Sequence, residues 1–184
     1  FGGRAHANYA ALLSDGDVDA VYMPLPTGLH DEWVHKALDA GKHLLAEKSL
    51  AGSLASASRM IQSARQKGLL VLENFLFPRH SQFAWVKEQL AAGAIGQVRF
   101  IRAAFTIPPL PADNFRYNRE LGGGALLDVG AYMVKSVTAL LGHDIELLAA
   151  TVDSSQSSVD LSGSATFRAP SGVVAQTLWS FDTA

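Results

Sequence analysis

The chain has 184 residues, of which 48% are apolar and 17% are charged, against a usual charged fraction of ~25%. This much apolar material supports a substantial core and excludes a disordered tail. The 15 basic and 17 acidic residues give a net charge of −2, and no block of basic residues is present. Neither a nucleic acid nor a membrane is therefore expected as a partner.

Cysteine is absent, which excludes disulfides, thiolate metal sites and a cysteine nucleophile. A reducing compartment is the simplest interpretation, so we expect a cytoplasmic protein. No apolar run approaches the ~18 residues of a membrane-spanning helix. The first residues, Phe1-Gly2-Gly3-Arg4, do not resemble a signal peptide.

The first part of the sequence alternates between two patterns. Short apolar runs predict strands over residues 18–23, 43–46 and 69–75. Amphipathic stretches between them predict helices over 30–40 and 54–68, the second capped by Ser53. Strands that alternate with helices form a parallel sheet with right-handed crossovers.

Ligands of such sheets bind beyond the carboxyl ends of the strands. These ends are followed by Pro24 to Thr27, by Glu47 and Lys48, and by Asn74 to Phe77. The ammonium group of Lys48 is expected to enter the cleft at this edge, although an ordinary surface lysine would also fit. Glu47 is suited to bind a ribose hydroxyl, or alternatively to partner Lys48 or a backbone amide.

The pattern changes from Pro78 onward. A helix is predicted to about Gly93, followed by a long strand over residues 97–107 and a loop through Tyr117. A glycine-rich helix start comes next, and then three antiparallel strands, over 145–153, 159–167 and 173–181. We therefore expect a partial Rossmann domain over residues 1–77 and an α+β domain over 78–184 that is truncated at its C-terminus.

No G-x-G-x-x-G turn is present, although a dinucleotide-binding half normally opens with one. The pattern begins as though roughly two strands of the sheet preceded it. We therefore expect a fragment of a longer protein.

The strongest local signal is the segment from Leu121 to Tyr132, which contains three consecutive glycines. Glycines allow a backbone to approach a ligand closely, and the following helix start offers N–H groups to it. Asp128 and Tyr132 are four residues apart and share one helix face. The alternative is that Tyr132 is a core aromatic and that Asp128 is an acid favoured by the helix dipole.

Lys48 and Tyr132 together indicate proton transfer. A phenol with an ordinary pKa of ~10 becomes a usable acid near neutrality when a cation is held close to it. Reduction of a carbonyl needs such a proton in addition to hydride. The histidines show no ligand spacing, so no metal site is expected, and neither a serine-hydrolase elbow nor a phosphate-binding P-loop is present.

The order of four motifs resembles the Gfo/Idh/MocA oxidoreductase family. These motifs occupy residues 22–30, 40–48, 93–99 and 122–132 and together cover most of the chain. The resemblance implies an N-terminal Rossmann domain that binds NAD or NADP. It also implies a C-terminal domain with an open, mostly antiparallel sheet that holds a sugar-like substrate and forms a homo-oligomer contact. The residue that selects NAD or NADP is expected outside this sequence.

The resemblance implies that Tyr132 is the proton donor and that Lys48 positions substrate and cofactor. Because Tyr132 replaces a histidine, the match is nearest the branch of glucose–fructose oxidoreductase, dihydrodiol dehydrogenase and nucleotide-sugar ketoreductases. The expected cofactor-binding residues are Pro24, Leu25, Pro26, Thr27, His30, Glu47, Lys48 and Asn74. The expected substrate-binding residues are Lys48, Arg116, Tyr117, Asp128 and Tyr132.

Two details refine this expectation. The segment from Phe105 to Tyr117 is similar to a loop of NDP-hexose 3-ketoreductases that faces the substrate, so Arg116 is suited to a diphosphate or a sugar. Ser49 stands where the family usually has a proline after the lysine, frequently in a cis bond. Because a cis bond before a residue other than proline costs ~3 kcal/mol, a trans bond is favoured here.

The expected function is therefore the NAD(P)-dependent reduction of a keto group on a sugar, most simply a nucleotide-linked one. A cofactor-free sugar-binding or regulatory module, or an inactive truncated product, remains the alternative.

Overall fold

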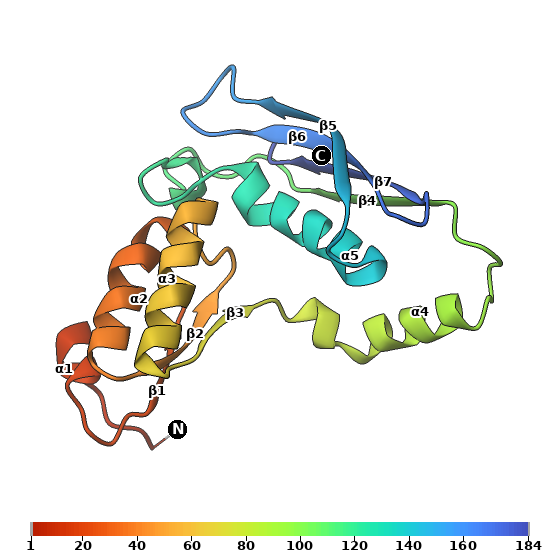
Figure 1. The fold of residues 1–184 in the computed structure, drawn as a ribbon. Coiled ribbons are helices and arrows are strands. Elements are labelled where there is room, and N and C mark those ends of the chain that lie inside the picture. Colours follow the sequence, from red (N-terminus) through yellow and green to blue (C-terminus); the bar gives the residue numbers. More distant parts are fainter. Residues whose placement is uncertain (1, 184) are drawn as a thin grey trace. The chain divides into compact units, whose positions relative to one another are not determined.

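The computed structural model describes residues 2–183 and divides into two compact units, one ending at Asn74 and the other beginning at Phe75 (Figure 1). Each unit has its own apolar core. None of the helices in the described range combines the length and the apolar composition needed to span a lipid bilayer.

The first unit contains a parallel sheet in the order β1-β2-β3. Its strands are β1 (Ala20–Met23), β2 (His43–Glu47) and β3 (Val71–Asn74). The crossovers are α2 (His30–Asp39), which follows the 3-10 turn η1 (Thr27–Leu29), and α3 (Leu54–Lys67). The predicted arrangement of parallel strands and helical connections is confirmed.

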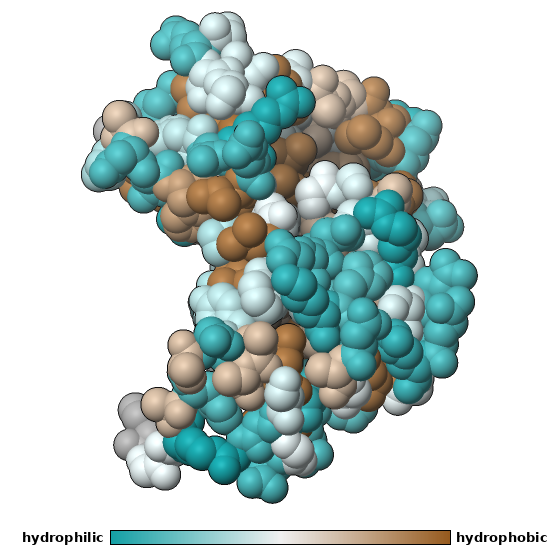
Figure 2. All heavy atoms as spheres, turned by 90° about the vertical axis from the view of Figure 1, so that its left-hand side faces the viewer, coloured by the Kyte–Doolittle hydropathy of each residue, from teal (hydrophilic) through white to brown (hydrophobic). Residues whose placement is uncertain are grey.

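The core of this unit lies where α2 and α3 cover the sheet. Val34 and Leu38 of α2 and Met60 of α3 are almost completely buried against Leu44 and Ala46 of β2. The outer sides of the helices carry ion pairs, Asp31 with Arg59, Asp39 with Lys67 and Glu32 with Lys36. This polar side forms much of the hydrophilic surface in the middle of Figure 2.

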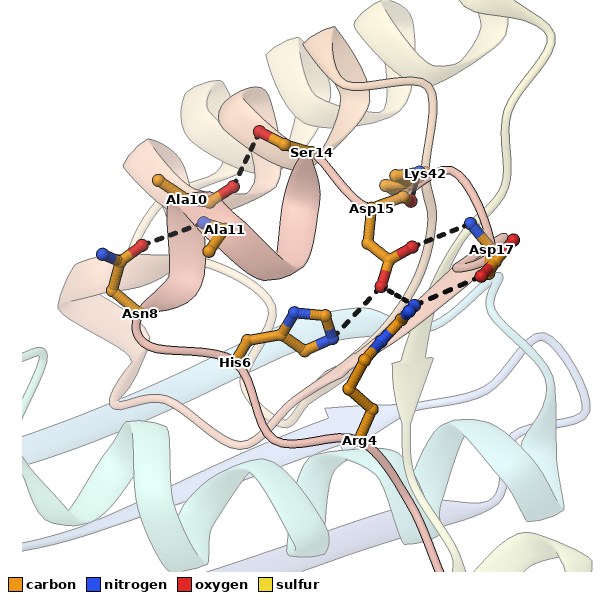
Figure 3. Close-up of polar contacts among 9 residues, drawn as sticks. All are labelled: Arg4, His6, Asn8, Ala10, Ala11, Ser14, Asp15, Asp17 and Lys42. Atoms are coloured by element: carbon orange, nitrogen blue, oxygen red, sulfur yellow. Dashed lines mark hydrogen bonds and ion pairs between the residues drawn. The ribbon is translucent and has the colours of Figure 1, made fainter.

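A short helix, α1 (Tyr9–Leu13), precedes β1 and was not predicted from the sequence. Asn8 caps it by accepting the Ala11 amide at 2.9 Å. Figure 3 shows how the segment before it is attached: Arg4 and His6 both reach the carboxylate of Asp15. Five residues give too short a hydrophobic pattern for prediction, so this helix depends on its cap and on these contacts.

The second unit contains a four-stranded sheet in the order β4-β7-β6-β5. The strands are β4 (Phe100–Thr106), β5 (Glu146–Asp153), β6 (Ser162–Arg168) and β7 (Val174–Ser180). Two of the three pairings are antiparallel, which confirms a mostly antiparallel sheet, but β4 pairs with β7 in parallel. Pairing between such distant segments depends on the tertiary fold, so local patterns do not reveal it.

Helices occupy one side of this sheet. The predicted helix up to Gly93 is divided into a 3-10 turn, η2 (Phe77–Arg79), and α4 (Ser81–Ala91). The helix after the glycines begins with a π-helical turn, η4 (Leu126–Gly130), and continues as α5 (Ala131–Leu141). Val129 and Val137 of this helix are buried in a core that includes Trp179 and Phe181.

Candidate active site

The carboxyl ends of the three parallel strands carry one hydrogen-bonded cluster. Tyr22, on β1, donates its hydroxyl proton to Oε1 of Glu47, on β2, at 2.6 Å. Asn74, on β3, donates from Nδ2 to the same oxygen at 2.7 Å. The sequence placed Glu47 and Asn74 at this edge, and the structure brings them into direct contact.

These contacts favour the charged form of Glu47. Burial alone would raise its pKa, but the hydrogen bonds from Tyr22, Asn74 and the Lys48 amide, with the positive charge of Lys48, hold the pKa below its usual value. The hydrogen bond to Glu47 raises the pKa of Tyr22 above its usual value, mainly because the neutral phenol is the donor. The cluster therefore presents an ionised carboxylate held by a neutral phenol.

The turn that carries Lys48 is fixed on its C-terminal side by two other residues. Thr27 Oγ1 donates to the Ser49 carbonyl at 3.1 Å, and the Leu50 amide donates to Oε1 of Glu73 at 2.7 Å. The bond between Lys48 and Ser49 is cis, so the expected trans bond is wrong. Backbone contacts of this kind are tertiary, which explains why the residue type at position 49 did not predict the geometry.

His30 lies beneath this edge and is completely buried. Its Nδ1 is 3.0 Å from the Leu50 carbonyl and its Nε2 is 2.8 Å from the Leu25 carbonyl. Both ring nitrogens thus face backbone oxygens of this chain. His30 links the loop after β1 to the turn after β2, and it acts on those loops from inside the unit.

The glycines before η4 make close contacts with the chain itself. A Cβ at Gly123 would lie 2.4 Å from the Arg116 carbonyl oxygen, and one at Gly124 would lie 2.3 Å from a carboxylate oxygen of Asp160. Gly124 also has φ of +116°, which side chains disfavour. Close contacts within the chain therefore require glycine at positions 123 and 124.

Asp160 also accepts hydrogen bonds from the first amides of the helix. Its backbone oxygen accepts from the Ala125 amide at 2.9 Å, and its Oδ2 accepts from the Leu126 amide at 2.6 Å. Two of the N–H groups that were expected to face a ligand are thus satisfied within the chain. The acid is 34 residues away from Leu126, so the local sequence pattern did not reveal it.

Asp128 and Arg116 form an ion pair at 2.6 Å, between Oδ2 and Nε, and both side chains are partly exposed. Asp128 lies in the π-helical turn, and such turns occur frequently at functional sites. The Tyr117 hydroxyl accepts the Leu110 amide at 2.9 Å, while its ring packs against Phe181. The structure therefore joins Arg116 to Asp128 and uses Tyr117 to hold the loop.

Tyr132, in the first turn of α5, is surrounded by aromatic rings. Phe75, Phe77 and Phe105 have ring centroids 5.6 to 6.0 Å from its own. The ring also lines an open groove of about 550 Å³ together with Leu76, Phe77, His80, Gln82, Phe83 and Val86. Tyr132 is thus partly buried in an apolar setting, with one side at a groove large enough for a small ligand.

The predicted site residues are divided between the two units. Lys48, Glu47, Asn74, His30 and the loop from Pro24 to Thr27 belong to the first, whereas Arg116, Tyr117, Asp128 and Tyr132 belong to the second. Across residues 2–183, no group of three or more acidic, histidine or cysteine side chains is arranged to hold a metal ion.

Sequence reasoning missed three residues that organise these sites, Tyr22, Glu73 and Asp160. Tyr22 and Glu73 lie on strands whose carboxyl ends had been identified, so the alternation of side chains along each strand was an available signal for them. Asp160 had no such signal because it precedes a strand in another part of the unit.

Comparison with known proteins is consistent with this division. Residues 1–75 match the family model of an oxidoreductase family with an NAD-binding Rossmann fold, and residues 83–184 match that of the GFO/IDH/MocA C-terminal domain. The two matched regions together span most of the chain. The chain belongs to the GFO/IDH/MocA family, which confirms the resemblance stated from its motifs.

Several relatives are sugar-nucleotide reductases. The chain is 46% identical to dTDP-3,4-didehydro-2,6-dideoxy-α-D-glucose 3-reductase of Streptomyces violaceoruber, over 100% of this chain and 54% of that protein. It superposes with a TM-score of 0.93 on KijD10, a 3-ketoreductase of Actinomadura kijaniata in complex with NADP and TDP-benzene. That match is 44% identical and covers 100% of this chain and 57% of the other. The chain therefore spans about half the length of these relatives.

Replacing Asp160 by alanine is expected to destabilise the second unit by ~1 kcal/mol, because the Leu126 amide loses its carboxylate acceptor at the start of the helix. Asp144→Ala, at an exposed acid of the same unit, serves as the matched control. Urea unfolding of both variants measures the difference. Equal stability of the two variants would show that the carboxylate of Asp160 contributes nothing to the helix start.

Proposed function

We propose that this chain is part of an NADP-dependent reductase that acts on the 3-keto group of a nucleotide-linked deoxy sugar. The observation that carries the proposal is the similarity to KijD10, which extends over the whole chain and therefore over both units. A D-xylose 1-dehydrogenase of Haloferax volcanii named for NADP, 36% identical over 180 residues, supports the choice of this cofactor.

The carboxyl edge of the first unit fits a dinucleotide cofactor. An ionised carboxylate at Glu47 is a strong acceptor for ribose hydroxyls, and the loop after β1 is held in place from below by His30. The residues proposed to hold the cofactor are Pro24, Leu25, Pro26, Thr27, Glu47, Lys48 and Asn74, with His30 acting through the loop. NADPH, when bound, supplies the hydride for the carbonyl carbon.

Tyr132 is proposed to supply the proton for the carbonyl oxygen. The aromatic rings around it limit the access of water, which strengthens the effect of any charge placed nearby. Lys48 is proposed to be that charge, because an ammonium group stabilises the phenolate that proton donation leaves. The phenol then gives up its proton more readily near neutral pH.

Arg116 and Asp128 are proposed to bind the sugar nucleotide. Nε of Arg116 is one of five N–H donors of the guanidinium, so the pairing with Asp128 leaves donors for a diphosphate oxygen. Asp128 is suited to accept a sugar hydroxyl. Tyr117 is proposed to contribute by holding the loop that carries Arg116.

We further propose that residues 1–77 and 78–184 act as cofactor and substrate domains and that the second forms a homo-oligomer contact. The side of the sheet opposite the buried core exposes Phe100 and Leu178, at 46% and 48%. Arg102 and Gln176, also exposed, lie on the same side, and a mixed surface of this kind is typical of subunit contacts.

In the protein produced from the whole gene, Tyr132→Phe is expected to lower the turnover of a dTDP-3-keto sugar by ~100-fold, because the variant lacks the proton donor. The Kd for NADPH, measured by fluorescence titration, should not change. Tyr9→Phe, at an exposed tyrosine of the first unit, is the control. Turnover close to that of the parent would contradict a role for Tyr132 as proton donor and leave it only a packing role. Sugar binding without any turnover in the parent would favour a binding module instead.

Lys48→Met is expected to lower activity and to move the basic limb of the pH–rate profile upward, since the phenol loses the cation that lowers its pKa. Lys67→Met, at a surface lysine paired with Asp39, should leave the limb in place. Steady-state rates between neutral and alkaline pH measure the shift. An unmoved limb with full turnover in Lys48→Met would contradict a role for Lys48 in proton transfer.

Leu178→Lys is expected to reduce the mass of the assembly, because a charge placed on an apolar contact must be desolvated when subunits associate. Sedimentation velocity measures the mass. Leu54→Lys, at a leucine that is 84% exposed in the first unit, is the control. An unchanged mass for Leu178→Lys would place any subunit contact elsewhere.

A further inference from the structure

We propose that Tyr22 is a positioning residue that acts through Glu47 on the backbone of Lys48. The proposal rests on the function proposed for Lys48 and concerns a residue at the carboxyl edge of the first sheet. It is carried by the geometry of three adjacent strands.

The strand register brings the three side chains together. Glu47 lies directly across from Asn74, and Tyr22 lies across from Leu45, two residues before Glu47. Because side chains alternate along a strand, Tyr22, Glu47 and Asn74 all project from the same face of the sheet near its carboxyl edge. A hydroxyl, a carboxylate and an amide thus meet where the chain leaves β2.

The hydrogen bonds fix the orientation of the carboxylate. The Tyr22 hydroxyl and the Asn74 amide both donate to Oε1 of Glu47, at 2.6 and 2.7 Å. Two donors from strands on opposite sides hold one oxygen, so rotation of the carboxylate would break both bonds. Since a carboxylate oxygen offers about two acceptor positions, Oε1 is fully used by these two donors.

Glu47 in turn holds the next residue. The Lys48 amide follows this fixed carboxylate directly in the chain, and the amide and the charged side chain of Lys48 both stabilise the ionised form of Glu47. The other side of Lys48 is fixed by Thr27 and Glu73 through Ser49 and Leu50. The Tyr22 hydroxyl holds Glu47 on one side of Lys48, while Thr27 and Glu73 hold the residues on the other side. Together these contacts orient the Lys48 backbone at the end of the strand.

The position of Tyr22 argues for this role over packing. Within this chain the residue is 54% exposed, and its hydroxyl is engaged by Glu47 at 2.6 Å. Tyr9 is 55% exposed in the same unit and packs edge-on against Trp33 with ring centroids 4.9 Å apart. It provides a matched tyrosine that does not contact Glu47.

The test compares Tyr22→Phe with Tyr9→Phe in the protein from the whole gene. Loss of one hydrogen bond to a carboxylate is expected to speed hydrogen exchange of the Lys48 amide by ~3- to 10-fold and to lower turnover by a similar factor. The melting temperature and the KM for the sugar should stay close to those of the parent. Tyr9→Phe should change none of these quantities.

A double-variant cycle tests the route through Glu47. If Tyr22 acts through the carboxylate, Tyr22→Phe should have little further effect in a Glu47→Gln background. An equal effect in both backgrounds, or unchanged exchange at Lys48 in Tyr22→Phe, would overturn the proposal. If the parent protein does not reduce a keto sugar, the proposed function fails, but exchange at the Lys48 amide still decides the role of Tyr22.

The charge of Glu47 gives a readout that packing alone would not move. The groups acting on this carboxylate are Tyr22, Asn74 and Lys48, and removal of the Tyr22 hydroxyl removes one contact that lowers its pKa. The pKa of Glu47, followed by NMR of its side-chain carboxyl carbon, is therefore expected to rise in Tyr22→Phe and to stay constant in Tyr9→Phe. A constant value in both variants would contradict the proposal.

Discussion

The first unit depends on hydrogen bonds between side chains and the backbone that follows β2. Glu73 holds the Leu50 amide, Thr27 holds the Ser49 carbonyl, and His30 faces the Leu50 carbonyl from the buried side. Each of these residues comes from a different segment. These three contacts hold a turn that has no regular secondary structure, which a lysine needs if it is to act at a defined position.

In the second unit, two glycines and one acidic residue hold the loop and the helix start that follows it. Gly123 and Gly124 allow the loop to pass within contact distance of Arg116 and Asp160, and Asp160 accepts the first amides of the helix. A further close contact, between Gly130 and the ring of Trp179, seats the helix on the sheet. The glycines thus position the helix that carries Asp128 and Tyr132, and they do so through contacts within the chain.

Much of the fold was predictable because its signals are local. Apolar runs, amphipathic spacing and helix stops such as Gly41 and Gly68 located the three parallel strands and the helices between them. Those strand ends also identified Glu47, Lys48 and Asn74. What could not be predicted depends on tertiary contacts, namely the parallel pairing of β4 with β7, the π-helical turn and the cis bond after Lys48. The short helix α1 was missed because five residues show no helical period.

The predicted site residues differ in the contacts that they make in the structure. Glu47 and Asn74 lie where the strand ends placed them, and they contact each other. His30 and Tyr117 are engaged with backbone groups of their own unit, so they shape loops that other residues use. A family motif therefore includes residues that hold the loop in place, beside residues proposed to touch a ligand. Sequence alone does not separate the two kinds, because both depend on the same positions at the end of a strand, and only their hydrogen-bond partners distinguish them.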